Sequence, residues 1–287
     1  AKGFIMRLDK EKRKSGPDRL TFNHSIALKA GEHFYKIIAE ELGLEKGDGK
    51  EWVKQAKRKD AIGPVELVAE KADTSESRIL ATSSRLTGVP IVDCEQVIAP
   101  NEPHWIIDGL PMTLLAGTEH GAKTLVHCIP FLEDYLDKEL LADFYEAIRI
   151  NFALTTPAGM LKHIQRCYNS GRARNRMLVR SEEDETPNFA DAIKILRAKE
   201  LLPRDFSEKA MRHEIISALE DERPKKGASG ETEWWSLCSD HPMLNLAAIA
   251  SSKELVEIID PSTQKRFGVV PICEHGGLLT IATKRGL

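Results

Sequence analysis

Apolar residues recur every four positions after Pro130, and this series constrains the fold more than any other feature. Its members are Leu132, Leu136, Leu140, Phe144 and Ile148. Side chains four residues apart lie on one face of an α-helix, so the series predicts a long helix that buries this face. Pro130 suits the first helical turn, where its missing N–H group is not needed. Acidic residues fill the intervening positions, which predicts an acidic outer face.

Shorter patterns place this helix beside a sheet. The sequence predicts strands at 90–99, 105–107 and 112–116, which are apolar and flanked by proline. Apolar residues at helical spacing predict a helix at 24–43, and 51–59 is predicted to be a short polar helix. The alternation of Val65, Leu67 and Ala69 predicts a strand at 64–70, and the polar stretch 72–87 is predicted to be a loop. We expect a small mixed sheet with the long helix packed on it.

Helix-start signals dominate the second half of the chain. Thr-Pro pairs at 156–157 and 186–187 and a serine at 207 predict three helices. After a polar linker at 221–233, a short apolar helix is predicted from His241 to Ile249. The stretch 255–259 fits either a helix or a strand, and 260–263 is predicted to be a turn. Strands at 267–272 and 278–283, with Gly276 and Gly277 between them, predict an antiparallel pair.

These elements predict an α+β protein with two parts. Residues 1–155 would form an α+β region that holds the mixed sheet and the long packed helix. Residues 156–287 would form a helical cluster followed by a short C-terminal antiparallel sheet. The length of 287 residues, with 41% hydrophobic and 30% charged residues, is sufficient for a globular core without disulfides.

The cysteines and the hydropathy pattern indicate a cytoplasmic protein. The five cysteines are scattered and form no C-x-x-C motif, which is typical of reduced thiols. No apolar run approaches the roughly 18 residues that a membrane span needs. A net charge of −3 argues against a protein that coats DNA with its whole surface, so any polyanion would have to bind one concentrated patch.

The segment 162–180 is such a patch, because it contains basic residues and no Asp or Glu. The basic residues are Lys162, Arg166, Arg172, Arg174, Arg176 and Arg180. Guanidinium groups bind phosphate through two parallel hydrogen bonds, and Tyr168 offers a ring on which a base can stack. We therefore predict a non-enzymatic protein that binds the backbone of RNA or DNA through this segment. The alternative is a surface loop whose arginines pair with the acids at 182–185 or with the acidic helix.

The octet 117–124, GTEHGAKT, resembles a Walker A phosphate-binding loop. In such a site Gly117 and Gly121 would shape the loop, Lys123 would contact phosphates and Thr124 would hold Mg²⁺, with Asp260 as a metal-binding carboxylate. The apolar run at 112–116 precedes the octet and a helix is expected to follow it, as the motif requires, but the motif also requires glycine where this chain has Ala122. An NTP-binding enzyme is therefore the second hypothesis, and no cofactor is assigned.

Three further features of the sequence bear on function. The helices expected at 187–201 and 207–219 have the spacing of a helix-turn-helix, with Lys209, Arg212 and His213 on the second helix. Histidine and cysteine at 120, 127 and 128, and again at 273 and 275, lack the paired spacing of a zinc site, so no metal is predicted. A third functional hypothesis is a scaffold subunit of an assembly, in which the acidic helix predicted after Pro130 attracts the basic loop of a neighbouring copy.

Overall fold

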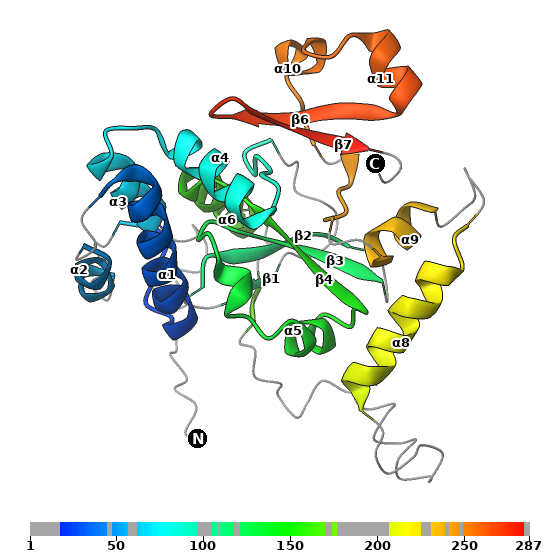
Figure 1. Ribbon diagram of the computed structural model, residues 1–287, viewed down its shortest axis with the longest axis horizontal. Helices are drawn as coiled ribbons and strands as arrows, with labels where there is room; N and C mark the ends of the chain where they lie inside the picture. The colour runs from blue at the N-terminus through cyan, green and yellow to red at the C-terminus, as the bar shows by residue number, and fades with distance from the viewer. Residues whose placement is uncertain are drawn as a thin grey trace.

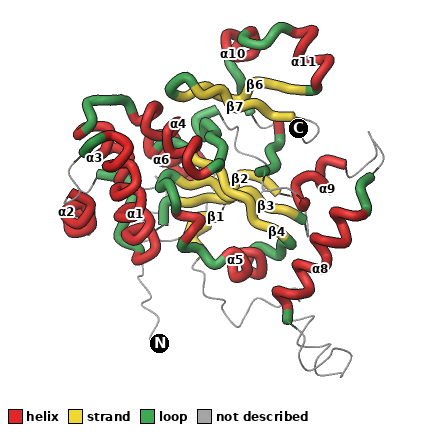
Figure 2. Tube along the Cα trace, in the orientation of Figure 1, coloured by secondary structure: helices red, strands yellow, loops and turns green. Residues whose placement is uncertain are grey.

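The computed structural model confirms an α+β protein (Figure 1). It describes residues 18–44, 48–56, 62–96, 105–107, 110–117, 121–169, 174–176, 207–224, 231–238, 241–246 and 249–283. A five-stranded mixed sheet lies at the centre, and helices cover it in Figure 2. A separate two-stranded sheet lies near the C-terminus. Within these residues, no helix is both long enough and apolar enough to cross a bilayer.

The central sheet has the strand order β4-β3-β2-β1-β5. Its strands are β1 (Trp105–Ile107), β2 (Met112–Gly117), β3 (Ala122–His127), β4 (Arg149–Leu154) and β5 (Arg174–Arg176). β2 is antiparallel to both β1 and β3, whereas β4 runs parallel to β3 and β5 runs parallel to β1. The strands predicted at 105–107 and 112–116 are therefore confirmed.

Four helices form the N-terminal layer, which packs against the sheet. They are α1 (Ser25–Leu42), α2 (Asp48–Gln55), α3 (Pro64–Lys71) and α4 (Glu76–Thr87). The predictions for α1 and α2 are confirmed, but those for 64–70 and 72–87 are wrong. α3 begins with Pro64 at its first position, and the Glu66 carboxylate accepts a hydrogen bond from the Gly63 N–H group. α4 is capped by Ser75 and ends at Gly88, whose φ is 74°.

The long helix predicted after Pro130 is also wrong. The segment instead forms a 3₁₀ turn, η1 (Leu132–Asp134), the short helix α5 (Lys138–Phe144) and then strand β4. Phe131 and Glu146 adopt left-handed backbone angles, with φ of 63° and 52°, and interrupt any continuous helix. Leu140, which belonged to the apolar series, is 50% exposed. The Ile148 N–H group donates to the Gly121 carbonyl. This hydrogen bond places the chain beside β3 just before β4 begins.

The expected strand at 90–99 is reduced to a short parallel pairing with β4. Ile91 bridges Leu154, and the Val92 N–H group donates to the Leu154 carbonyl at 2.8 Å. Residues 93–96 turn away from the sheet, and 97–99 lie outside the described residues. This pairing brings the loop after α4 against the end of β4, where helix α6 starts.

The second half of the chain contains the helices α6 (Pro157–Asn169), α8 (Glu208–Asp221), α9 (Glu231–Cys238), α10 (Lys253–Glu257) and α11 (Pro261–Phe267). The starts of α6 and α8 confirm their predicted caps, while the helix predicted from 187 lies outside the described residues. α10 resolves the ambiguity at 255–259 in favour of a helix. The turn predicted at 260–263 opens α11. The described residues between His241 and Ile249 form no regular helix, contrary to expectation.

The C-terminal sheet pairs β6 (Val269–His275) with β7 (Leu278–Thr283) in antiparallel register, as predicted. Figure 1 shows α10 and α11 stacked on this hairpin. The hairpin docks on the N-terminal layer: the Cys273 thiol donates to the Ile91 carbonyl at 3.2 Å, and His275 Nδ1 lies 3.2 Å from Ser77 Oγ. Strand β5, which follows residue 155, also joins the central sheet.

Candidate nucleic-acid interface

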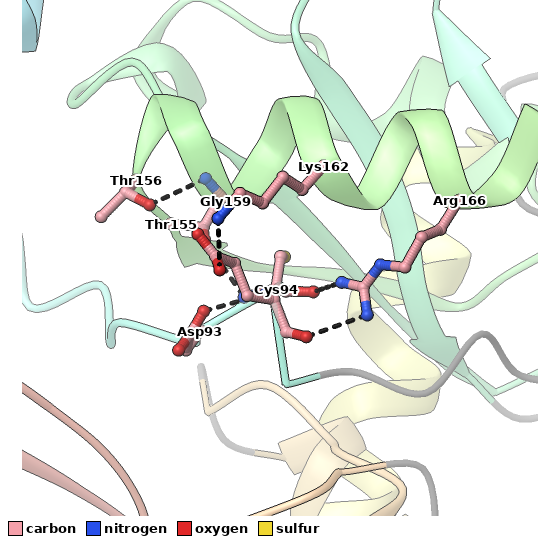
Figure 3. Close-up of polar contacts among 8 residues, drawn as sticks. Asp93, Cys94, Thr155, Thr156, Gly159, Lys162 and Arg166 are labelled. Carbon is pink, nitrogen blue, oxygen red and sulfur yellow. Dashed lines mark hydrogen bonds and ion pairs between the residues drawn. The ribbon is translucent and has the colours of Figure 1, made fainter. Parts of the chain in front are cut away.

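Helix α6 carries the first part of the basic segment, and its start is fixed by two threonines (Figure 3). The Thr156 hydroxyl accepts a hydrogen bond from the Gly159 N–H group at 2.9 Å and caps the helix. The Thr155 hydroxyl accepts one from the Cys94 N–H group at 3.3 Å. A side chain at Gly159 would place its Cβ 2.9 Å from the Thr156 hydroxyl. The loop at 93–95 is therefore held tightly against the first turns of α6.

Lys162 and Arg166, one turn apart on α6, both reach this loop. The Lys162 ammonium lies 2.8 Å from the Glu95 carboxylate, with 59% of the lysine side chain exposed. Arg166 donates through Nη1 to the Glu95 carbonyl at 2.9 Å and through Nη2 to the Cys94 carbonyl. Figure 3 shows the guanidinium bridging the two carbonyls. Arg166 thus binds the protein's own backbone, whereas Lys162 makes only a solvent-exposed ion pair.

The sequence predicted the cations of α6 but not their partners. Glu95 lies 67 residues before Lys162, and Cys94 lies 72 residues before Arg166. The contact forms because the loop after α4 pairs with the end of β4. No local pattern near 93–95 signals this pairing, although the Thr-Pro cap at 156–157 correctly located the start of α6.

Two of the predicted arginines lie on strand β5, at the edge of the central sheet. Arg174 pairs in register with Trp105 and Arg176 with Ile107. Tyr168 is in the last turn of α6. Arg172 and Arg180 lie outside the described residues.

The thiol beside this interface is not a nucleophile. Burial, only partly offset by the Thr155 hydroxyl and the Arg166 charge, raises the pKa of Cys94 to about 12. Burial likewise raises the pKa of Cys128 well above its ordinary value. A protonated thiol is a poor nucleophile and a poor metal ligand. Both cysteines belong to the buried hydrophobic core.

The Walker-like octet does not adopt the expected conformation, because a strand follows it instead of a helix. Gly117 pairs with Lys123 across a β-hairpin between β2 and β3. The buried Thr124 hydroxyl donates to the Met243 carbonyl at 2.7 Å. This hydroxyl is the group that would hold Mg²⁺, and it already has a hydrogen-bond partner within the protein. No helix N-terminus follows Gly121 to receive phosphates.

Asp260, the expected metal-binding carboxylate, caps helix α11. It accepts hydrogen bonds from the Ser262 hydroxyl at 2.5 Å and the Thr263 N–H group at 3.0 Å. These bonds lower the pKa of Asp260 to about 2. In Figure 1, α11 lies apart from the β2–β3 hairpin. The structure therefore does not bring the candidate nucleotide-binding residues together.

Arg212, a candidate for reading DNA from the second helix, is buried. It donates to the Ala147 carbonyl at 2.7 Å and forms an ion pair with Asp143. It thereby fastens α8 to the end of α5. In the described part of the chain, no group of three His, Cys, Asp or Glu side chains is arranged to hold a metal ion.

Comparison with protein-family models, curated proteins and solved structures gave no match.

Proposed function

We propose that the protein binds the phosphate backbone of a nucleic acid through the segment 162–180, without catalysing a reaction. The observation that carries this proposal is the uninterrupted run of six basic residues in a chain of net charge −3. Concentrated positive charge releases counterions from a polyanion and so favours its binding. A reducing compartment such as the cytoplasm suits the protein, since all five cysteines are free thiols.

Lys162 is available to a phosphate. An exposed ion pair such as Lys162–Glu95 contributes only about 0–1 kcal/mol, so exchanging the carboxylate for a phosphate costs little. Arg166 has a different role, because it donates to two backbone carbonyls. We assign Arg166 to positioning the interface, and Lys162, Arg172, Arg174, Arg176 and Arg180 to contacting phosphates.

The length of the basic segment suits contact with several consecutive phosphates of one nucleic-acid strand. Residues 170–173 join α6 to β5, so the end of the helix and Arg174 are at most about 18 Å apart. Over that distance one strand in a helical geometry presents about five phosphates, at 3.4 Å each along the axis. Tyr168, in the last turn of α6, would supply a stacking surface between the two groups of cations.

The test is fluorescence anisotropy of labelled single-stranded RNA at low and near-physiological salt. Replacing Arg172, Arg174 and Arg176 together by alanine should weaken binding at least tenfold. It should also reduce the salt slope by about 2, since each lost phosphate contact removes roughly 0.7 on a single strand. An unchanged affinity would disprove the proposal.

A matched variant controls for net charge. Lys253, Lys265 and Arg266 lie on α10 and α11 and are exposed, so replacing them by alanine removes the same three charges elsewhere. We expect this control to retain nearly the affinity of the unaltered protein. Equal losses in both variants would mean that binding depends on total charge and not on the 162–180 segment.

A further inference from the structure

A cavity of about 390 Å³ lies between the end of α4, the η1 turn and strand β4. Its walls include Leu86, Val89, Phe131, Ile150 and Phe152. Phe152 and its neighbour Asn151 on β4 both line this cavity, and the Asn151 side-chain amide also donates to the carbonyls of Ser236 and His241 near α9. The volume is within the usual range for small-molecule sites. None of the functions considered above uses this cavity.

Glu133 supplies a buried negative charge to the cavity wall. Its side chain is only 10% exposed, and Oε2 lies 3.3 Å from Nε2 of the fully buried His127. Burial opposes ionisation, but the contact with His127, a backbone N–H group and the charge of Lys138 outweigh it and hold the pKa of Glu133 below its ordinary value. Because Glu133 lines the cavity, its negative charge attracts a cation that binds there.

The protein already places a cation in this environment. The Lys138 ammonium lies 5.6 Å from the centre of the Phe152 ring, within the range of a cation–π interaction. Lys138 is exposed at the first position of α5, so its ammonium can move into solvent. A second carboxylate, Asp134, lies at the same cavity. The two carboxylates together carry more negative charge than the single lysine carries positive charge.

We propose that this cavity binds a small organic ammonium ion with an apolar body. The ammonium donates to Glu133 and replaces the Lys138 ammonium, while the apolar body packs against Phe131 and Phe152. An anionic ligand of the same size would meet two carboxylates. The site is independent of the nucleic-acid interface and rests on none of its residues.

The test uses phenethylammonium as the probe and the neutral 2-phenylethanol as its isostere, with binding followed by ligand-observed NMR. Fragments of this size bind weakly, so titrations extend into the millimolar range. We expect phenethylammonium to bind at least tenfold more tightly than 2-phenylethanol, the effect of one charge-assisted hydrogen bond. Equal binding of the two probes, or none, overturns the proposal.

Two variants locate the site. Glu133→Gln should weaken phenethylammonium binding about tenfold or more, whereas the exposed Glu254→Gln on α10 is a matched control that should leave it unchanged. Lys138→Met removes the competing ammonium at an exposed position that the fold tolerates. It should tighten phenethylammonium binding. Weaker binding in Lys138→Met would show that Lys138 does not compete with the bound ammonium, and this result contradicts the proposal even if Glu133→Gln fails to fold.

Discussion

Two cations on one face of α6 differ in what they contact. Arg166 donates to two backbone carbonyls of the loop after α4, and Lys162 pairs with a carboxylate at the surface. Both belonged to the same basic run, and sequence alone gave them the same role. Charge is visible in a sequence, but the partner that satisfies it is not when that partner lies some 70 residues away. The sequence therefore predicts which residues belong to the candidate site, but it does not predict which of them contact the protein itself and which remain exposed.

Arg166→Lys is expected to destabilise the protein by roughly 1–3 kcal/mol. A lysine keeps the charge but loses the planar fork that reaches both carbonyls, and it leaves a partly buried acceptor unsatisfied. Urea unfolding measures the difference. Lys162→Met is the control and should change stability by no more than about 1 kcal/mol, because it removes only an exposed ion pair. If both variants were equally stable, the tethering role of Arg166 would be wrong.

At the scale of single elements, helix caps and turn residues located the elements more reliably than the four-residue apolar series after Pro130 did. α6 and α8 begin at their predicted caps, and the Gly-Gly turn correctly located β6 and β7. The four-residue series after Pro130 failed because Asp137 adopts an extended conformation and caps a new short helix, α5. Glu146, with its positive φ, then separates α5 from β4. Pro64 and Ser75 are helix-start signals in the sequence of α3 and α4, but the alternating pattern at 64–70 and the polar pattern at 72–87 are typical of a strand and a loop.

Packing between α1 and α2 depends on a glycine. The Trp52 side chain is 1% exposed, donates to the Ile62 carbonyl at 3.1 Å and lies directly against Gly31 of α1. Any Cβ at Gly31 would overlap the six-membered ring of Trp52. The helices can therefore approach closely only because position 31 has no side chain.

Gly31→Ala is expected to lower the free energy of unfolding by roughly 1–3 kcal/mol through overpacking. The loss should appear even though alanine favours a helix by about 1 kcal/mol over glycine. Trp52→Leu makes room at the same contact, so the double variant should lose clearly less than the sum of the two single losses. Chemical denaturation of all four proteins gives the coupling, and strictly additive losses would exclude the proposed contact.

At the scale of the whole molecule, contacts between residues distant in sequence join the first half of the chain to the second. Strand β5 extends the sheet of the first half, and Arg212 ties α8 to α5. The C-terminal hairpin meets α4 at Gly276, whose φ is 56° and whose position lies close to the backbone of Ser77 and Arg78. The α+β class could be predicted from the local patterns, but these attachments could not, since each depends on residues distant in sequence.

Gly276→Ala should loosen the C-terminal hairpin from α4. The new Cβ would lie 2.8 Å from the Arg78 Cα atom and 2.9 Å from the Ser77 carbonyl oxygen, so backbone must move. Gly277→Ala is the matched control, because Gly277 also has a positive φ, of 80°, but has open space around it. In both variants the free energy of unfolding should fall by about 1–2 kcal/mol, because alanine is strained in a left-handed backbone conformation.

Hydrogen exchange of peptides covering 269–283 separates the two effects. Gly276→Ala alone should show faster exchange across β6 and β7, together with a further loss of roughly 1–3 kcal/mol from the steric clash. Identical exchange in the two variants would mean that the hairpin does not depend on this close approach.

Strand β5 has a consequence for how the protein is made. β1 ends at Ile107 and its outer partner begins at Arg174, so about 67 residues must leave the ribosome before that edge is covered. At roughly 5–20 residues per second this takes about 3–13 seconds. During that interval the nascent sheet presents an open strand edge, the feature through which chains pair wrongly with one another. The strand that finally closes the edge carries arginines, and charge on an outer strand discourages a further chain from adding to it.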